Sequence, residues 1–170
     1  MINPLLVLTL AAQVVPHIYA QAADQHAVFA MTNSVGGNQV IAYSRAANGS
    51  LIEGNHFATG GRGSGGTTDP LGSQGSLTLS QNHSLLFAVN AGTGDLSVFR
   101  VNGANLQLVQ VVSSGGSAPV AIAQHGNLVY VINSAGNSNV VGFQLGAFGN
   151  LVMIPNSIRY LSAPNTGPCP

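Results

Sequence analysis

The sequence predicts an all-β protein, a partial β-propeller of about three four-stranded antiparallel blades. An apolar strand pattern recurs along the chain, and the composition suits short strands joined by tight turns. Val and Leu are plentiful, Gly numbers 22, and the helix formers Glu and Lys are almost absent. No stretch shows the 3.6-residue apolar spacing of an amphipathic helix, so negligible helix is expected.

Three segments share one pattern, in which an apolar strand ends in Asn before a Gly-rich turn. They are Val28-Phe-Ala-Met-Thr-Asn33, Leu85-Leu-Phe-Ala-Val-Asn90 and Leu128-Val-Tyr-Val-Ile-Asn133. An alternating strand follows each, and a third strand begins at Leu51, Leu106 or Leu151. A further strand precedes copies two and three, at residues 75–80 and 119–123. Four antiparallel strands in about 40–45 residues are typical of a propeller blade.

These strands place the blades at about residues 27–58, 75–113 and 119–161. The first copy lacks the innermost strand, and a Gly-rich insertion separates it from the second. Propellers typically carry about four to eight blades, so three are not expected to close a ring. The sequence stops where a fourth blade should begin, and the expectation is a truncated or alternatively ended gene product.

The N-terminus has the order of a secretory signal peptide. Residues 5–12 are apolar but too few to span a membrane as a helix, and Ala20-Gln21-Ala22 offers small residues for cleavage. The segment before them carries no Lys or Arg, and a buried strand or helix of the fold is the alternative. The expected division is a signal peptide over 1–22 and a partial propeller over 23–170, in a secreted, extracellular protein.

Charge and cysteine content exclude several classes. Charged residues make up 5% of the chain, and all four cations are Arg. A nucleic-acid partner is not expected, because such proteins need a basic surface. Beyond residue 22 no apolar run approaches the roughly 18 residues of a spanning helix, so no membrane span is expected. Cys169 is the only cysteine, which excludes an intrachain disulfide and leaves pairing between chains open.

Several short sequence motifs of the chain are more specific for a family than its strand pattern is. They are Val28-Phe-Ala-Met-Thr-Asn33, Phe57-Ala-Thr-Gly-Gly-Arg-Gly63, Leu71-Gly-Ser-Gln-Gly75, Leu86-Phe-Ala-Val-Asn-Ala-Gly92, Ser114-Gly-Gly-Ser-Ala-Pro-Val120 and Leu161-Ser-Ala-Pro-Asn-Thr-Gly-Pro168. They resemble the lactonase-family seven-bladed propellers, which include 3-carboxymuconate cyclase-like proteins and 6-phosphogluconolactonases. The resemblance implies a parent of seven blades, of which this chain supplies the first three, and it ends at Cys169-Pro170. Because the residues associated with chemistry in those members lie mostly in the other blades, no catalytic residue is carried over.

Two residues are candidates for ligand binding. Strand direction alternates, so the Gly-rich loop 59–75 should share one face with the turns that follow the three repeated strands, and a funnel on one face is the usual ligand site of propellers. Arg62, the sole charge in Gly60-Gly-Arg-Gly-Ser-Gly-Gly66, would bind a carboxylate or phosphate. Gln74 would face the channel. The alternatives are a flexible surface loop for Arg62 and a structural hydrogen bond to a neighbouring blade for Gln74.

Other chemistry is not expected. The histidines lack metal-ligand spacing, no nucleophile elbow joins a strand to a helix, and the acidic residues are scattered, so neither a metal nor a cofactor is predicted. Asn48-Gly-Ser50 and Asn82-His-Ser84 are N-glycosylation sequons, which suits an exported protein. Both should lie in turns on the face opposite the Gly-rich loop.

Two functions remain open. The first is a secreted, non-catalytic propeller fragment that acts by binding, for example as a secreted effector. The second is a lactonase or muconate cycloisomerase-type enzyme completed by oligomerisation or by blades encoded beyond Pro170. In either case an open ring exposes apolar lateral faces and a strand edge, so self-association or a protein partner that covers them is expected.

We predict signal-peptide cleavage after Ala22, with Ala20 as the second choice, because both follow an apolar run with small residues. N-terminal sequencing of secreted material tests this directly. Exported protein that retains Met1 would contradict it.

Overall fold

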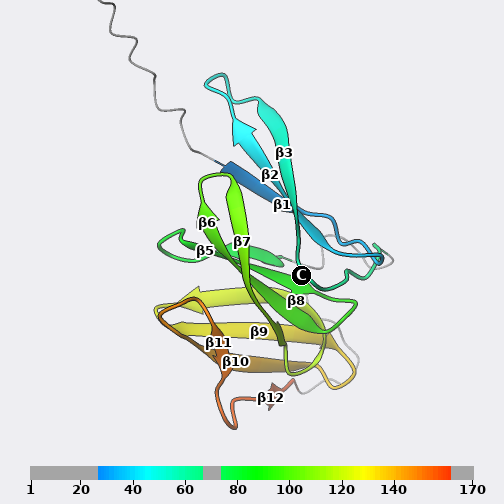
Figure 1. Cartoon of the computed structure of the whole chain (residues 1–170). Coiled ribbons are helices and arrows are strands. Elements are labelled where there is room, and N and C mark those ends of the chain that lie inside the picture. The colour runs from blue at the N-terminus through cyan, green and yellow to red at the C-terminus, as the bar shows by residue number, and fades with distance from the viewer. Residues whose placement is uncertain (1–26, 67–73, 162–170) are drawn as a thin grey trace, which may run out of the picture.

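The computed structural model describes residues 27–66 and 74–161, and these contain strands but no helix. Three antiparallel sheets follow one another along the chain, from blue and cyan through green to yellow and orange in Figure 1. The predicted all-β partial propeller is confirmed. The described ranges hold no helix that could cross a membrane. The predicted signal peptide and Cys169 lie outside the described residues.

The first sheet has three strands, in the order of the chain: β1 (Ala27–Met31), β2 (Gln39–Arg45) and β3 (Leu51–Ala58). As the sequence predicted, the described residues provide it with no innermost strand. Its β2–β3 hairpin projects away from the other sheets (Figure 1).

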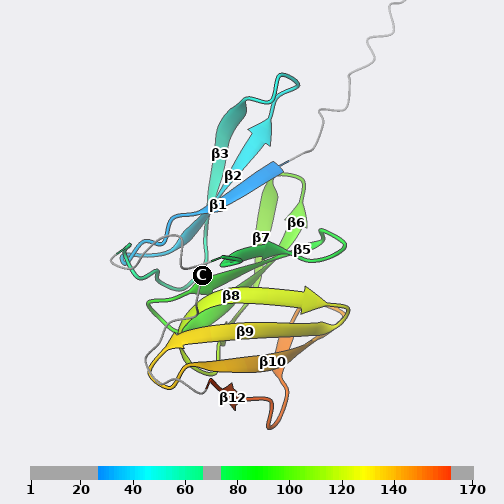
Figure 2. The ribbon, with the colours of Figure 1, turned by 180° about the vertical axis from the view of Figure 1, so that it is seen from behind.

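The second and third sheets each begin with such an inner strand. The second consists of β4 (Leu77–Leu79), β5 (Leu85–Asn90), β6 (Asp95–Asn102) and β7 (Asn105–Ser113). The third consists of β8 (Ser117–His125), β9 (Leu128–Ala135), β10 (Asn139–Leu145), β11 (Leu151–Met153) and β12 (Arg159–Tyr160). β1 contacts β4 and β3 contacts β7, and β8 contacts both β4 and β5, so the second sheet contacts both of the others (Figure 2).

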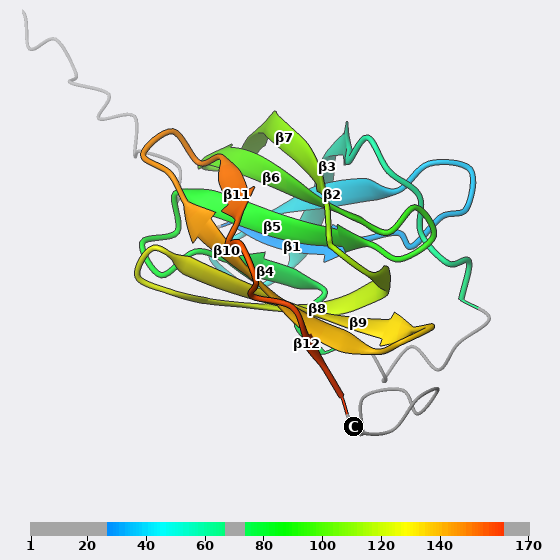
Figure 3. The same ribbon diagram turned by 90° about the horizontal axis from the view of Figure 1, so that it is seen from below.

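The outer edge of the third sheet is interrupted. β11 and β12 both pair with β10, and the chain bulges between them (Figure 3). Ser157 bridges the interruption, since its Oγ accepts from the amide of Gly142 at 3.1 Å and donates to the carbonyl of the same residue at 3.0 Å. The backbone of β10 therefore stays satisfied where the strand beside it is missing.

The structure corrects the alignment of the first copy by one residue. In the second and third sheets the repeated asparagine, Asn90 or Asn133, lies opposite the first residue of the next strand. In the first sheet the corresponding position belongs to Thr32, whose amide donates to the carbonyl of Gln39 at 3.0 Å. Asn33 lies one residue further on, at a left-handed φ of 53° that Asn tolerates better than most residues.

The second sheet is the centre of the core because apolar residues cover both of its faces. One buried cluster joins it to the third sheet and contains Phe87, Val89, Leu96, Val98, Ile122, Val129, Val131, Val141 and Phe143. The other joins it to the first sheet and contains Val40, Leu86, Ala88, Phe99 and Leu106. All six positions of β5 are consequently buried, and its sequence shows no polar alternation.

The outward face of the third sheet is equivalent, by strand position, to the face of the second sheet that packs against the third. Phe87 lies three residues before Asn90, and Tyr130 lies three residues before Asn133, so the two aromatic residues are equivalent. Phe87 is fully buried against the third sheet, whereas Tyr130 is 45% exposed. The same strand position is therefore a core position in one sheet and a surface position in the next.

We predict that Phe87→Ala lowers the free energy of unfolding by about 3–5 kcal/mol, because it opens a cavity between two sheets. Tyr130→Ala, the matched control, should cost about 1 kcal/mol or less, since its ring is half exposed. Denaturant unfolding of both variants measures the difference. Equal losses would contradict the assignment of the third sheet's outer face as surface.

Candidate functional site

The turns of the three sheets form two opposite faces of the molecule. One face, which we call the loop face, carries the turns 32–38, 91–94 and 136–138 and the links 59–66 and 114–116. The opposite face, which we call the hairpin face, carries the turns 46–50, 80–84, 103–104, 126–127 and 146–150. As predicted from strand alternation, Arg62 lies on the first and both sequons lie on the second.

On the loop face, the buried side chain of Asn90 joins the first sheet to the second. Its Oδ1 accepts from Nδ2 of Asn38 at 3.1 Å and lies 2.8 Å from the hydroxyl of Thr59. Its Nδ2 donates to Oδ1 of Asp95 at 2.6 Å and to Oγ of Ser97 at 2.8 Å. One amide thus satisfies polar groups of both sheets, and we call this arrangement the amide clamp.

The clamp requires glycine beside it. A Cβ on Gly61 would lie 2.5 Å from the side chain of Asn90, and a Cβ on Gly116 would lie 2.6 Å from that of Asn133. Both distances are well below ordinary van der Waals contact. The recurring phrases Thr59-Gly-Gly and Ser114-Gly-Gly therefore mark the places where the amide of the next sheet presses against the backbone.

The clamp at the second junction is less complete. Nδ2 of Asn133 donates to the carbonyl of Ser114 at 3.2 Å and to Oδ1 of Asn139 at 2.9 Å, but its buried Oδ1 has no partner among the described residues. At the first junction Asn38 supplies a donor. Gly94 is the equivalent residue at the second junction: its carbonyl accepts from the amide of Ser114, as the carbonyl of Asn38 accepts from the amide of Thr59. Gly94 has no side chain and so cannot supply the donor.

Arg62 lies on the loop face, as predicted, and its side chain is exposed. Its backbone fastens the loop to the second sheet: the amide donates to Oγ1 of Thr93 at 3.1 Å, and the carbonyl accepts from Gly92 at 2.9 Å. On the other side, Oδ1 of Asn33 accepts from the amide of Ser64 at 2.8 Å. Residues 60–64 are thus a tethered loop rather than a free one, and the guanidinium faces solvent.

Gln74 is exposed in the turn before β4. The carbonyl of the adjacent Gly75 accepts from the amide of Ile122 at 3.0 Å, which ties this turn to the inner strand of the third sheet. Residues 67–73, which connect Gln74 to the loop of Arg62, lie outside the described residues. Ligand binding by Arg62 and by Gln74 therefore remains two independent predictions.

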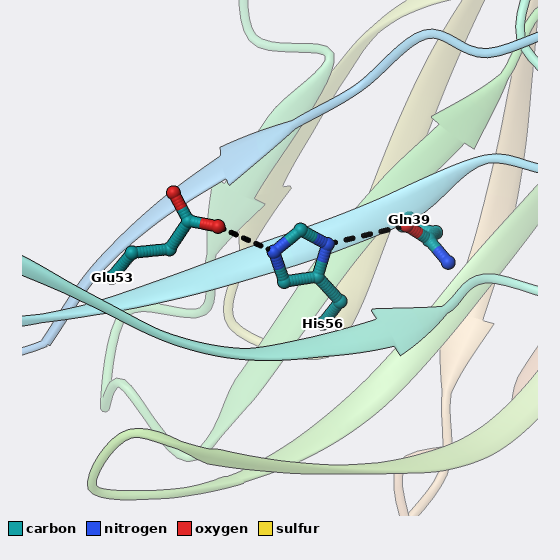
Figure 4. A network of polar contacts seen from close by, with 3 residues as sticks. All are labelled: Gln39, Glu53 and His56. Carbon is teal, nitrogen blue, oxygen red and sulfur yellow. Dashed lines mark hydrogen bonds and ion pairs between the residues drawn. The ribbon is translucent and has the colours of Figure 1, made fainter.

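A polar pair that sequence reasoning missed lies on the outer face of the first sheet. Nε2 of His56 is 2.8 Å from Oε1 of Glu53, and its Nδ1 is 3.3 Å from Oε1 of Gln39 (Figure 4). Positions three apart on a regular strand face opposite sides, but a bulge between the partners of Ile41 and Tyr43 brings both onto one side. Such an exposed pair contributes little to stability. No group of three metal-binding side chains occurs in the described ranges.

Both sequon asparagines occupy exposed turns on the hairpin face. Oδ1 of Asn48 accepts from the amide of Ser50 at 3.0 Å and from its hydroxyl at 2.7 Å. Oδ1 of Asn82 accepts in the same way from Ser84, at 3.1 and 2.8 Å. The two turns share this local bonding, but only Asn82 borders a groove.

That groove lies on the hairpin face between the second and third sheets, with a volume of about 440 Å³. Its lining residues come from the segments 80–85, 124–126 and 145–149, which contain hairpin-face turns, and from β6. Arg100 is the only charged residue among the described residues that line it, and one of its N–H groups donates to the carbonyl of Phe148 at 3.2 Å. Sequence reasoning did not single out Arg100, because no motif surrounds it and only folding brings the turns together.

Comparison with protein families identifies the fold as one already known. The sequence model described as "Lactonase, 7-bladed beta-propeller" matches residues 37–160. The chain belongs to this family. A search of the curated proteins found no match.

Solved structures of the lactonase propeller fold align with most of the chain. A putative 6-phosphogluconolactonase from Bacteroides fragilis aligns with a TM-score of 0.61 and 24% identity, over 82% of this chain and 40% of its own. The periplasmic gluconolactonase of Pseudomonas aeruginosa aligns with a TM-score of 0.57 and 24% identity, over 82% and 42%. The chain spans about two fifths of the length of these structures, which resemble it in fold.

We predict that Asn90→Ala lowers the free energy of unfolding by about 2–4 kcal/mol, because several buried groups lose their partner at once. Asn133→Ala should cost less, since that amide makes fewer hydrogen bonds. Arg62→Ala should change stability by no more than about 0.5 kcal/mol, since its side chain is exposed. Denaturant unfolding ranks the three, and an equal loss for the two asparagine variants would refute the difference between the junctions.

Proposed function

We propose that this member of the lactonase propeller family is a secreted protein that acts by binding rather than by catalysis. Export is supported by the apolar and small-residue pattern of residues 1–22. A role as a secreted effector belongs to the same proposal, since an exported binding protein of this kind acts on a partner outside the cell.

The proposal rests on one observation: the acidic group of the loop face is committed to a structural hydrogen bond. Asp95 and Glu53 are the only acidic residues in the described ranges, and Asp95 alone lies on this face. Its Oδ1 accepts from Nδ2 of Asn90 at 2.6 Å, so it is part of the amide clamp. A general acid or base must reach a substrate proton, and a carboxylate committed to a structural bond is poorly suited to that task.

The partner is proposed to cover a lateral face. The outer face of the third sheet exposes Tyr130 and carries the half-buried Ile132 and Val140, which lie on the same side. Its equivalent on the second sheet is buried against a neighbour. A second copy of the chain or another protein with an apolar sheet face fits such a surface.

A second function is favoured by the family itself. Arg62 is exposed on the loop face, in a tethered loop, and two relatives in fold are described as a gluconolactonase and a putative 6-phosphogluconolactonase. The alternative is therefore a lactone hydrolase or a muconate cycloisomerase-type enzyme, in which Arg62 binds the anionic group of the substrate. Completion by oligomerisation or by further blades belongs to this alternative.

An assay of lactone hydrolysis separates the two. With glucono-δ-lactone and its 6-phosphate, the purified full chain should leave the hydrolysis rate at that of buffer. A rate above buffer that Arg62→Ala lowers, without a change in stability, would establish the enzyme instead. If an anionic ligand of the loop face is found, the same substitution should weaken its binding.

We predict that the full chain self-associates at micromolar concentration, because an apolar sheet face is exposed. Light scattering should give a mass above that of one chain, and Tyr130→Arg should lower it by placing a charge at the contact. A control substitution on the hairpin-face turn, Asn48→Gln, should leave the mass unchanged. A monodisperse monomer would contradict the proposed use of this face.

A further inference from the structure

The groove on the hairpin face combines three features that neither the fold nor the loop face requires. It has a volume of about 440 Å³, within the range of about 300–1,000 Å³ that is usual for small-molecule sites. Its lining includes a cation, an aromatic residue and several residues with amide or hydroxyl side chains. It also lies at the opposite end of the sheets from Arg62 and from the amide clamp.

Arg100 faces the groove because of its strand register. It lies directly opposite Leu85, which packs in the core between the second and third sheets, and residues directly opposite share a face. The matching place in the third sheet, opposite Leu128, is taken by Gln144, so the fold does not require a cation there. A guanidinium has five N–H donors, and its bond to the Phe148 carbonyl uses one of them.

Phe148 is exposed to 79%, and the turn that carries it does not need an aromatic residue. The turn 46–50 of the first sheet has the same two backbone bonds, from Ala46 to Ser50 and from Gly49 to Ala46, as the turn 146–150 has between its corresponding residues. At the place of Phe148 it carries Asn48. The fold therefore leaves this position open to an aromatic residue that lines the groove, and such a residue can pack on a ligand there.

The rest of the lining suits hydroxyl groups. The side-chain amides of Gln81 and Gln124 each use one N–H group, toward His125 and the carbonyl of Gly126, and keep the other. Asn82 offers its side-chain N–H groups, and the hydroxyls of Ser80 and Ser84, which donate to Oδ1 of Asn82, keep lone pairs that can accept. Among the described residues of the lining, none is acidic and would repel an anion. We propose that this groove binds an acidic sugar unit, a pyranose that carries a carboxylate. Arg100 pairs with the carboxylate, the face of the sugar ring packs on Phe148, and the amides and hydroxyls bond the sugar hydroxyls.

The proposal does not depend on whether the loop face is catalytic, since the two sites lie on opposite faces. Asn82 borders the groove, so a glycan attached there would lie beside it. Binding is therefore measured on the full chain produced without glycosylation. Sodium glucuronate and sodium galacturonate are the probes, glucose and acetate are the matched neutral sugar and plain carboxylate, and an oligogalacturonide distinguishes a polysaccharide end from a free sugar acid.

In amide-resolved NMR titrations, a uronate should shift signals of residues 80–85, 124–126 and 145–149. Arg100→Gln should weaken uronate binding by about tenfold or more, since a charge-assisted pair is lost. Glucose should bind the wild type about as weakly as a uronate binds the Arg100→Gln variant. Phe148→Ala should also weaken binding, whereas Arg62→Gln, on the opposite face, should leave it unchanged. Melting temperatures of all variants confirm that they fold.

Tighter binding of the oligogalacturonide than of the monosaccharide would assign the groove to polysaccharide, and equal binding would assign it to free sugar acids. Three results would overturn the proposal: shifts confined to other residues, equal affinity for glucuronate and glucose, or unchanged affinity in a folded Arg100→Gln variant. The lactone assay above can fail or succeed without affecting any of these outcomes.

Discussion

Each sheet of this chain can bury its apolar faces only against the sheets beside it, and the remaining features of the molecule depend on that constraint. The second sheet has a neighbour on both sides, so Phe87 and Phe99 are buried on its opposite faces. The first and third sheets each have one neighbour among the described residues. Equivalent strand positions therefore differ in exposure, as Phe87 and Tyr130 do.

The amide clamp fixes how neighbouring sheets meet. Apolar packing alone is not directional, whereas the bonds of Asn90 to Asn38, Asp95 and Ser97 specify one arrangement of the strand ends. The close approach of Gly61 removes the room for any side chain there. This arrangement commits Asn38, Asp95 and Ser97 to structural bonds, and it limits the chemistry available on the face where propellers usually hold their ligands.

The hairpin face is under less constraint. Its turns need only reverse the chain, so their tips accept residues as different as Asn48 and Phe148. Function can therefore be added there at little cost in stability, which is consistent with the general observation that binding residues concentrate on loops held by a rigid scaffold. The two faces of the molecule consequently differ in kind, one organised by buried amides and the other by exposed, variable turns.

The sequence by itself determined the class of fold, the three repeats and the face on which Arg62 lies, because these follow from local strand patterns and from alternating strand direction. It misplaced the first repeat by one residue, since Thr32 and Asn33 are both polar and only the pairing with Gln39 distinguishes them. The pair of His56 and Glu53 and the groove around Arg100 came only from the tertiary structure. A bulge brings the first together and the packing of two sheets creates the second, and neither leaves a signal in the spacing of residues along the chain.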